Sequence, residues 1–450
     1  MKYNVLLTAV GSVGLVFLGA CNGCGEESSS TWHPTKQDAG ADAADATVAD
    51  ATTDKDASLD TSKPDVAADQ SAPDAPADSA ADAIEAQAEA AAVDADFSYD
   101  GGPLTPWEKL PTKCTAAAEK GVVWLAAQQK ANGAWGTDMG MYSMAATGLA
   151  VVKLETYALE HGKSPFSPNF QYKSNVEAGL SFLFQNVQTA PMSGPNDTNS
   201  DGLGVTTALT NYVSSIVLMA VAAGQGFNQT VNSPGSPVHG WKFQQVAQDM
   251  TDYFAQCQAP QGGWRYSCPS GDADNSVSQY VSLGIEYAVH PDYQFFCNLP
   301  ASVSTGLWTW VGAVQDMNSG GSGYTSAADG PNPYRTGALL QELAFLKQGP
   351  GTVQVDAALN YLNGAWAQPM SGNPADYMAM WSIMKGLVGQ GVTMVGAHDW
   401  YQEYCDLLVS QQNVDGSWPM AQWDTQSTEG SLSAAWALLI LEKAAPAKLY

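Results

Sequence analysis

The sequence predicts an all-α protein in which six helical hairpins follow a long acidic segment. Apolar residues recur at helical spacing in twelve stretches between residues 101 and 450, for example at Leu432, Trp436 and Leu439. No comparable run alternates apolar and polar residues as a half-buried strand would. A short segment with Gln, Gly and Trp recurs between consecutive stretches, which indicates a repeated hairpin unit.

The first 21 residues are typical of a bacterial lipoprotein signal. Lys2 opens a positive segment, and the apolar stretch 5–17 is too short and too interrupted by glycine to span a membrane comfortably. It ends in Leu18-Gly19-Ala20-Cys21, which resembles a lipobox and implies lipidation of Cys21. An ordinary signal peptide with a chance cysteine is the alternative. Because Asn22 rather than Asp follows, we expect a lipid-anchored protein of the bacterial cell envelope, in the outer membrane if the cell is Gram-negative.

Residues 22–100 form an acidic segment that we expect to be disordered. They contain 19 acids and three bases, and their apolar residues are nearly all alanine. Such a segment buries too little surface to offset its ordering entropy, and its like charges favour an extended stalk. The whole chain has a net charge of −27, and residues 101–450 hold 26 acids and 14 bases. We expect no nucleic-acid partner, because these few bases cannot form a basic patch.

Three segments of the chain share a glutamine followed by Gly-x-Trp. They contain the pairs Gln128 and Trp135, Gln258 and Trp264, and Gln411 and Trp418. A weaker copy runs from Gln315 to Tyr324, with Tyr replacing Trp. Glycine allows a sharp chain reversal after a helix, while the Trp can cover the loop and the Gln can cap backbone groups. We interpret the motif as structural rather than catalytic.

The helical stretches pair into hairpins around this motif and its degenerate copies. The first helices are expected near 112–129, 173–187, 242–258, 302–316, 352–364 and 400–412. The second helices are expected near 138–154, 205–223, 275–289, 334–347, 375–389 and 430–443. The result is six hairpins.

The Gln–Gly–Trp segments resemble the QW motif of squalene and oxidosqualene cyclases and the related repeats of protein prenyltransferase β subunits. That superfamily folds as a ring of six outer and six inner helices, so the resemblance implies a single (α/α)6 toroid over roughly residues 105–445. The predicted organisation is a lipoprotein signal peptide over 1–21, a disordered linker over 22–100 and the toroid over 101–450. Such a fold provides a concave site without fixing its chemistry.

An acid precedes or opens each second helix of the predicted hairpins. These acids are Asp138, Asp201, Asp272 with Asp274, Asp329, Asp376, and Asp424 with Glu429. The inner helices of a toroid point the same way, so we expect these acids around one mouth, the end at which the inner helices begin. Two interpretations stay open. The acids cap helices, because Asp is a favoured N-cap, or they form an electronegative mouth for a cation, a metal or a polyhydroxylated ligand.

Aromatic and arginine side chains are expected beside the same mouth. The aromatic candidates are Tyr142, Tyr280, Tyr334, Tyr377, Trp381 and Trp436. Their rings can stabilise a cation or stack on sugars, or they can simply form core. Arg265 and Arg335 would clamp an anion or a carboxylate, or they would form surface ion pairs.

The junction from Gly262 to Ser276 contains several side chains that could act in catalysis or binding, among them Asp272 and Asp274. In class II terpene cyclases this place carries Asp-x-Asp-Asp-Thr, whose middle Asp protonates an alkene or an epoxide. The resemblance places Asp274 on the proton donor and Asp272 on the first Asp, with Ser276 in place of Thr. Two departures stand against it. Asn275 replaces the last Asp, and the chain has one toroid where triterpene cyclases use two helical domains.

Prenyltransferase β subunits hold zinc with an Asp-x-Cys pair and a distant His. No Asp-x-Cys pair occurs in this sequence, so we expect no metal site and no cofactor. The cysteines of the toroid are Cys114, Cys257, Cys268, Cys297 and Cys405. Export permits disulfides; Cys257 and Cys268 are the favoured pair, Cys297 is the next candidate for either, and at least one cysteine stays unpaired.

Three classes of function remain open. The favoured class is a non-catalytic surface module that binds a small molecule, a glycan or a protein partner, and contacts the membrane through lipidated Cys21. The second is a terpene-cyclase-like isomerase in which Asp274 donates a proton. The third is a carbohydrate-active hydrolase or lyase in which Asp272 or Asp274 works with an acid across the mouth, roughly 5–9.5 Å away.

Overall fold

The computed structural model describes residues 109–138, 140–424 and 427–444. They lie within one compact unit, residues 87–450. The predicted signal peptide with Cys21, and the predicted stalk over residues 22–100, lie outside the described residues. Among the described helices, none is long and apolar enough to cross a membrane.

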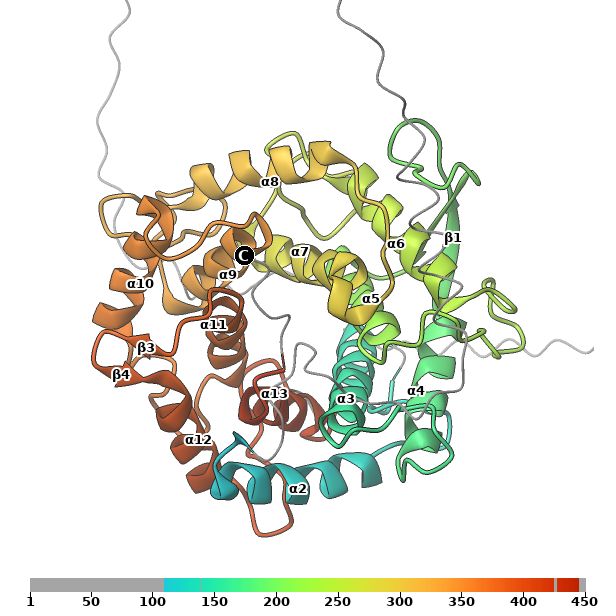
Figure 1. Ribbon diagram of the computed structural model, residues 1–450, viewed down its shortest axis with the longest axis horizontal. Coiled ribbons are helices and arrows are strands. Elements are labelled where there is room, and N and C mark those ends of the chain that lie inside the picture. The colour runs from blue at the N-terminus through green and yellow to red at the C-terminus, as the bar shows by residue number, and fades with distance from the viewer. Residues whose placement is uncertain (1–108, 139, 425–426, 445–450) are drawn as a thin grey trace, which may run out of the picture. The chain divides into compact units, whose positions relative to one another are not determined.

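Twelve α-helices alternate between an outer and an inner layer in the described part of the chain (Figure 1). The outer helices are α2 (Thr112–Ala127), α4 (Lys173–Gln185), α6 (Phe243–Cys257), α8 (Ala301–Val314), α10 (Val353–Ala365) and α12 (Trp400–Gln411). The inner helices are α3 (Met141–Glu160), α5 (Asn211–Ala222), α7 (Asn275–Val289), α9 (Pro333–Phe345), α11 (Tyr377–Gly389) and α13 (Ser431–Leu441). The predicted (α/α)6 toroid of six hairpins is confirmed.

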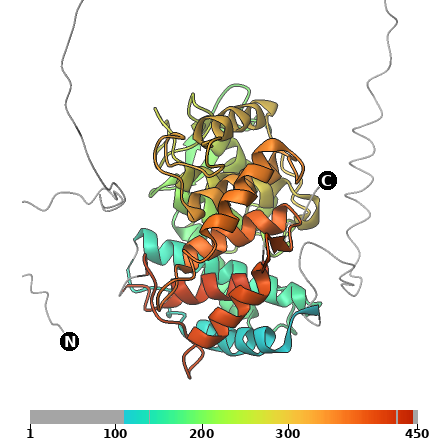
Figure 2. The ribbon, with the colours of Figure 1, turned by 90° about the vertical axis from the view of Figure 1, so that its left-hand side faces the viewer.

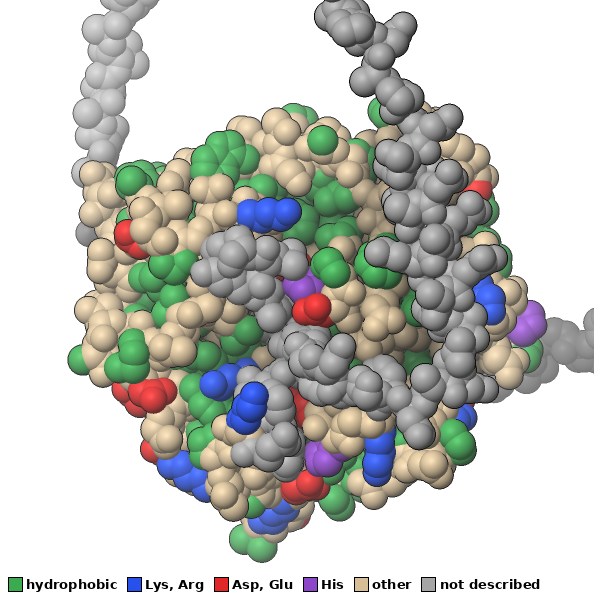
Figure 3. All heavy atoms as spheres, viewed as in Figure 1, with side chains coloured by type: hydrophobic (Ala, Val, Ile, Leu, Met, Phe, Trp, Pro, Cys, Tyr) green, Lys and Arg blue, Asp and Glu red, His purple; other side chains and the backbone are tan. Residues whose placement is uncertain are grey.

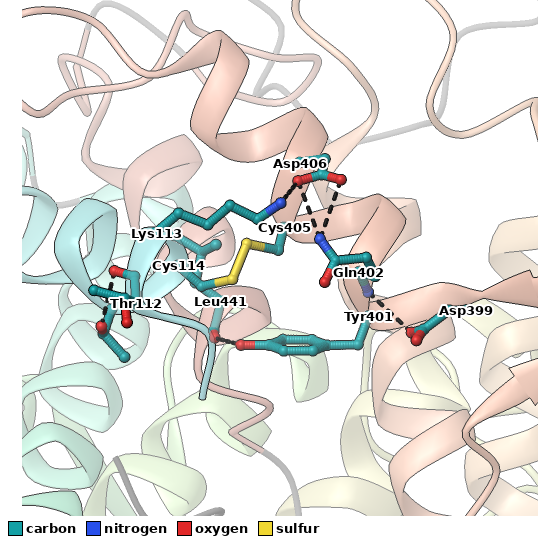
Figure 4. Close-up of a disulfide and its surroundings, with 10 residues drawn as sticks. Thr112, Lys113, Cys114, Asp399, Tyr401, Gln402, Cys405, Asp406 and Leu441 are labelled. Carbon is teal, nitrogen blue, oxygen red and sulfur yellow. Dashed lines mark hydrogen bonds and ion pairs between the residues drawn. A yellow bond between two sulfur atoms is a disulfide. The ribbon is translucent and has the colours of Figure 1, made fainter. Parts of the chain in front are cut away.

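The inner helices form a closed ring. Each packs against the next from α3 to α13, and α13 packs back against α3. In both Figure 1 and Figure 2, the first hairpin, in teal, lies beside the last, in red. A disulfide between Cys114 of α2 and Cys405 of α12 joins the first and last outer helices (Figure 4). Beside it, the Tyr401 hydroxyl donates to the Leu441 carbonyl at 2.6 Å.

The two layers differ in how much of each helix is buried. In α3, every residue from Ser143 to Glu160 is buried, because neighbours surround the helix on all sides. Inner helices α9 and α11 approach closely, since a Cβ at Gly386 would lie 2.7 Å from the carbonyl oxygen of Gly337. Outer helices α8 and α10 instead bury one stripe, at Val303, Leu307, Trp310, Val311 and Val314 in α8 and at Val355, Ala358, Leu362 and Ala365 in α10.

Two short antiparallel β-hairpins lie outside the predicted pattern. β1 (Val187–Pro191) pairs with β2 (Leu203–Thr207), and β3 (Met394–Val395) pairs with β4 (His398–Asp399). β2 takes residues that the sequence assigned to a helix over 205–223. The run Val-Thr-Thr that closes β2 is β-branched and favours a strand, so α5 begins later, at Asn211.

The Gln–Gly–Trp motif can join one hairpin to the next, as the third junction shows. Trp264 is buried, and its indole Nε1 donates to the Phe254 carbonyl at 2.8 Å. The Gln258 amide Nε2 donates to the Gly262 carbonyl at 2.7 Å, within its own loop, and to the Val303 carbonyl of the next outer helix at 2.9 Å. Gly262 has a φ of 94°, and a Cβ there would lie 1.8 Å from the carbonyl oxygen of residue 306, so this position requires glycine.

A glutamine that donates both to its own glycine loop and to the next outer helix recurs at three other junctions. The donors are Gln129 (to Gly133 and Asn175), Gln315 (to Gly320 and Gln354) and Gln412 (to Gly416 and Ala117). The predicted Gln128 and Gln411 are therefore wrong by one residue. Successive residues of a helix point about 100° apart, so one glutamine of each adjacent pair faces the next outer helix. Gln128 donates to the Trp124 carbonyl instead, and Gln411 accepts from Tyr377.

Replacing Trp264 by Ala should lower the free energy of unfolding by about 3–5 kcal/mol, because a buried indole and its hydrogen bond are lost. Chemical denaturation would measure this loss. The control is Trp308→Ala on α8, where the side chain is 43% exposed and the expected loss is no more than about 1 kcal/mol. Equal losses in the two variants would contradict the structural role of the motif.

Candidate functional site at the mouth of the toroid

Two of the predicted acids cap inner helices directly. Asp274 Oδ1 accepts from the backbone amide of Val277 at 2.9 Å, at the start of α7. Asp376 Oδ1 accepts from the Ala379 amide at 3.0 Å, at the start of α11. Both contacts satisfy amides that a helix N-terminus leaves unpaired. At these two positions the capping interpretation is confirmed.

Acids also contact the starts of α3 and α13, although glycine is the N-cap residue of each helix. Asp138 Oδ1 accepts from the Ser143 hydroxyl at 2.6 Å, and Asp424 Oδ2 accepts from the Ser433 amide at 2.8 Å. Glu429 instead forms an ion pair with Lys130 at 2.6 Å.

Two of the predicted mouth acids do not reach the start of an inner helix. Asp201 lies in the connection between β1 and β2, close to α6, and Thr210 caps α5 in its place. Asp329 folds back on its own loop and accepts from the Thr325 amide at 2.6 Å, while Asn332 caps α9. These connections are long enough to form a hairpin or a turn, so distance along the sequence did not fix where the acid lies.

Asp274 is fully buried, and its carboxyl group is held by Val277, Ser276 and Arg265. Its Oδ1 also accepts from the Ser276 hydroxyl at 2.6 Å, and its Oδ2 lies 3.4 Å from Nε of Arg265. Burial raises the pKa of Asp274, while hydrogen bonds from Ser276 and Val277 and the charge of Arg265 oppose that rise. Asp272 lies at the same guanidinium, 3.4 Å from Nη1 of Arg265, and its side chain is 66% exposed. Arg265 therefore joins the two aspartates of the junction.

Both arginines of the 450-residue sequence meet at one tyrosine. The guanidinium carbons of Arg265 and Arg335 lie 5.7 and 5.0 Å from the centroid of the Tyr324 ring. Arg265 also lies 5.8 Å from the ring centroid of Tyr266, and the hydroxyls of Tyr266 and Tyr324 are 3.4 Å apart. All four side chains are half-buried. We call Arg265, Tyr266, Tyr324 and Arg335 the Arg–Tyr cluster.

Tyr324 does not replace the Trp of the fourth motif. The bridging loop glycine lies two residues before the Trp in the intact motif, and two residues after Gly320 the chain has Ser322. The Ser322 amide donates to the Thr336 hydroxyl at 3.1 Å, as the Trp264 amide does to Ser278 at 2.9 Å. Tyr324 thus corresponds to Tyr266, two residues beyond the motif.

The predicted mouth aromatics Tyr280, Trp381 and Trp436 are buried in the ring interior. The rings of Tyr280 and Trp381 have centroids 5.4 Å apart. The ammonium of Lys385 lies 3.9 Å from the Trp381 centroid and 4.7 Å from that of Tyr280. These ring faces already hold a cation of the protein itself.

Three buried ionisable residues of this interior were missed by the sequence analysis. Lys385, Glu286 and Glu342 are at most 4% exposed. Burial lowers the pKa of Lys385 to about 7, although Glu286 and Glu342 oppose that shift. Burial raises the pKa of Glu286 to about 8 and that of Glu342 well above its usual value. A single charged residue inside an otherwise apolar helix, such as Lys385 in α11, could have indicated a buried charge from the sequence.

Cysteine pairing agrees in part with the sequence. The predicted disulfide between Cys257 and Cys268 is confirmed, and Cys297 is free and buried. The other disulfide, Cys114 to Cys405, joins residues 291 positions apart. Among the described residues, no three His, Cys, Asp or Glu side chains are placed so that they could together hold a metal ion. On the face in Figure 3, acidic and basic side chains of the described residues are scattered among uncharged ones.

No family model and no curated protein matches the sequence. Solved structures give matches over most of the chain. An inactive variant of an α-1,6-mannanase of Salegentibacter sp. HEL1_6 in complex with α-1,6-mannotriose has a TM-score of 0.49 at 10% identity, covering 72% of this chain and 98% of that one. A type II terpene cyclase variant from Scytonema in complex with merosterolic acid A has a TM-score of 0.43 at 12% identity, covering 74% and 97%. A protein from Actinoplanes has a TM-score of 0.43 at 14% identity, covering 73% and 98%. Similarity at this level assigns no reaction to this chain.

The cap at Asp274 predicts different results for two substitutions. Asp274→Asn keeps an oxygen that accepts from the Val277 amide, whereas Asp274→Ala leaves that amide unpaired. We expect the Ala variant to be less stable than the Asn variant by about 0.5–2 kcal/mol in chemical denaturation. Equal stabilities would contradict a capping role for this carboxyl group.

The buried Lys385 predicts a pH dependence of stability. Because its pKa is about 7 in the folded protein, the unfolded chain binds more protons at this residue above pH 7, so its contribution to the unfolding free energy rises with pH up to about 10. The opposite contribution of Glu286 ends near its pKa of about 8.

Between pH 8 and 10, the unfolding free energy of the wild type should therefore rise relative to that of Lys385→Met, by at most about 1.4 kcal/mol per pH unit. Urea unfolding at three pH values would measure it. Lys347→Met, at an exposed position, is the control for the loss of one lysine. A difference that stays constant with pH for Lys385→Met would refute the assignment.

Proposed function

We propose that this protein is a lipid-anchored, non-catalytic binding module that holds a carboxylate-bearing glycan against the Arg–Tyr cluster. The observation that carries the proposal is the meeting of both arginines of the chain at Tyr324. The chain uses lysine for its other 16 basic side chains. Arginine differs from lysine in presenting a planar fork of donors that fits a carboxylate.

Arg265 has a donor available for such a ligand. Its Nη1 is buried and makes no hydrogen bond, although the Asp272 carboxylate lies 3.4 Å away. Asp272 is mostly exposed, and an exposed ion pair of this kind contributes about 0–1 kcal/mol. A ligand carboxylate can therefore take the place of Asp272 at little cost, while buried Asp274 keeps the other side of the guanidinium in position.

The two tyrosines favour a polyhydroxylated ligand. Tyr266 and Tyr324 are half-buried, and their hydroxyls lie 3.4 Å apart. Each phenol hydroxyl can both donate and accept a hydrogen bond. Sugar hydroxyls offer the complementary groups, so a uronic acid residue supplies both the carboxylate and the hydroxyls that this cluster can bind.

The interior of the toroid argues against terpene cyclisation. A carbocation intermediate needs open aromatic faces, and those of Tyr280 and Trp381 are taken by the Lys385 ammonium. A proton donor must also be strongly acidic and directed into the cavity. Asp274 uses one oxygen to cap α7, and its other oxygen faces Arg265.

The same guanidinium argues against acid–base hydrolysis by this aspartate pair. Both carboxyl groups of a catalytic pair need contact with the substrate. Asp274 is fully buried, and Arg265 pairs with both aspartates.

The proposed anchor fits a binding role. Lipidation at Cys21, followed by the charged segment 22–100, would hold the toroid at a distance from the bilayer while leaving its mouth open to polymers.

Calorimetric titration with an oligogalacturonate tests the proposal, with a neutral glucose oligomer of equal length as the ligand control. We expect binding of the acidic oligomer alone. Arg265→Lys should weaken it about tenfold or more, because the planar fork is lost. Asp272→Asn should strengthen it, because a competing carboxylate is removed. The exposed Asp356→Asn removes the same charge on α10 and should leave affinity unchanged.

Equal affinity for the neutral oligomer, or unchanged affinity in Arg265→Lys, would contradict the proposal. Conversion of an isoprenoid to a cyclic product would replace it with the cyclase hypothesis.

A further inference from the structure

The connection between β1 and β2, residues 192–202, is fixed against outer helix α6. The Thr198 hydroxyl and amide donate to Asp252 of α6 at 2.8 and 3.2 Å. Gln248 of α6 donates to the same Thr198 hydroxyl at 2.8 Å. Asp252 accepts from Gln248 as well, at 3.0 Å, so this carboxylate serves to hold the connection in place.

This connection contains the sequence Asp197-Thr198-Asn199-Ser200-Asp201-Gly202. Calcium loops begin with oxygen-bearing side chains at positions 1, 3 and 5 and a glycine at position 6, which allows the chain to turn sharply. Gly202 has a φ of 79°, and its amide donates to Asp197 Oδ2 at 3.0 Å. The chain therefore folds back so that the carboxylate of position 1 lies beside the glycine of position 6.

The backbone of the residue at position 7, Leu203, also lies at the loop. The Met192 amide donates to the Gly202 carbonyl at 2.9 Å, so these two residues form a hydrogen-bonded pair of the β-ladder. Leu203, the next residue, then directs its amide and carbonyl away from β1. Its amide donates to Asp201 Oδ1 at 2.9 Å, which places the Leu203 backbone at the loop.

Asp249 of outer helix α6 adds a carboxyl group beside this loop. Its side chain is fully buried, and its Oδ2 makes no hydrogen bond. Asp197 Oδ1 is likewise buried without a hydrogen bond. A buried carboxylate oxygen without a partner is costly, and Asp201, Asp252 and Asp197 add repulsion at Asp249. Two buried carboxyl oxygens without a hydrogen bond beside one loop are suited to bind a cation.

The Asn199 amide lies between the acids in the place expected for an ion. Its Nδ2 donates to Asp249 Oδ1 at 2.8 Å and to Asp201 Oδ2 at 3.2 Å. Exchanging the oxygen and nitrogen of this amide would direct Oδ1 toward the same point. Because the amide group keeps the carboxylates apart, three acidic side chains do not converge in the structure as it stands.

We propose that Asp197, Asn199, Asp201, the Leu203 carbonyl and Asp249 bind one Ca²⁺ ion. All five ligands are oxygens, and four come from a loop that can adjust to the large, flexible coordination shell of calcium. The sequence analysis expected no metal because it looked for zinc ligands and placed Asp201 at the mouth. The site is independent of the Arg–Tyr cluster.

A bound Ca²⁺ ion would fix more firmly the connection that links outer helix α4 to inner helix α5. Titration of the chelator-treated protein with CaCl₂ in a calorimeter should show one site, with a Kd of about 10⁻⁴–10⁻³ M as in extracellular calcium modules. Ca²⁺ should also raise the melting temperature, because it binds the folded state. MgCl₂ should bind more weakly, since Mg²⁺ demands a rigid octahedral shell.

Two variants separate ion binding from folding. Asp249→Asn removes the buried carboxylate, and Asp201→Asn removes an exposed one that has no core packing to lose. Each should weaken Ca²⁺ binding at least tenfold. Asp356→Asn is the matched control, because it too is an exposed aspartate that accepts one backbone amide at 2.9 Å. It should bind Ca²⁺ as the wild type does. No binding at 10 mM CaCl₂, or wild-type affinity in Asp201→Asn, would overturn the proposal.

Discussion

A glutamine side chain that donates to two backbone carbonyls in different hairpins sets the geometry of this ring. The amide Nε2 has two hydrogens, and at four junctions one reaches the glycine loop of its own hairpin and the other reaches the next outer helix. A ring closes when each hairpin is rotated by nearly the same angle relative to the one before it. A repeated hydrogen bond between neighbouring hairpins favours such a constant angle. The last bridge, from Gln412 to Ala117, returns to α2, so the chain closes with the contact that it uses elsewhere.

Most of the fold could be predicted from local sequence patterns, whereas contacts between residues far apart in the sequence could not. The helices follow from apolar spacing, and Cys257 with Cys268 from their nearness around one loop. By contrast, nothing near Cys114 in the sequence points to Cys405, because their approach depends on closing the ring. Which of Gln128 and Gln129 bridges two hairpins depends on where each side chain points from the end of the helix. Two adjacent glutamines in a sequence do not reveal that direction.

The candidate site shows the same division between local and long-range information. Asp274 and Asp376 could be placed from the sequence, because an N-cap is defined by its own helix. The position of Lys385 between Tyr280 and Trp381 could not, because those rings come from two different inner helices. Lys385 thus packs against the protein's own aromatic side chains inside the ring. Most residues of both proposed binding sites lie instead in connections outside the helices, where a rigid scaffold presents variable loops.

The disulfide between Cys114 and Cys405 also changes what a protease can do to this protein. The backbone between the two cysteines and the sulfur bridge together form one covalent circle. It contains nine of the twelve described helices in whole, α3 to α11, and α2 and α12 in part, while α13 follows it. A single cleavage in any connection of that circle opens it without separating the pieces, since the bridge still joins them. Both fragments stay in contact, and the broken hairpins can remain packed against their neighbours. Outside a reducing compartment, release of a fragment from within residues 114–405 therefore requires two separate cuts.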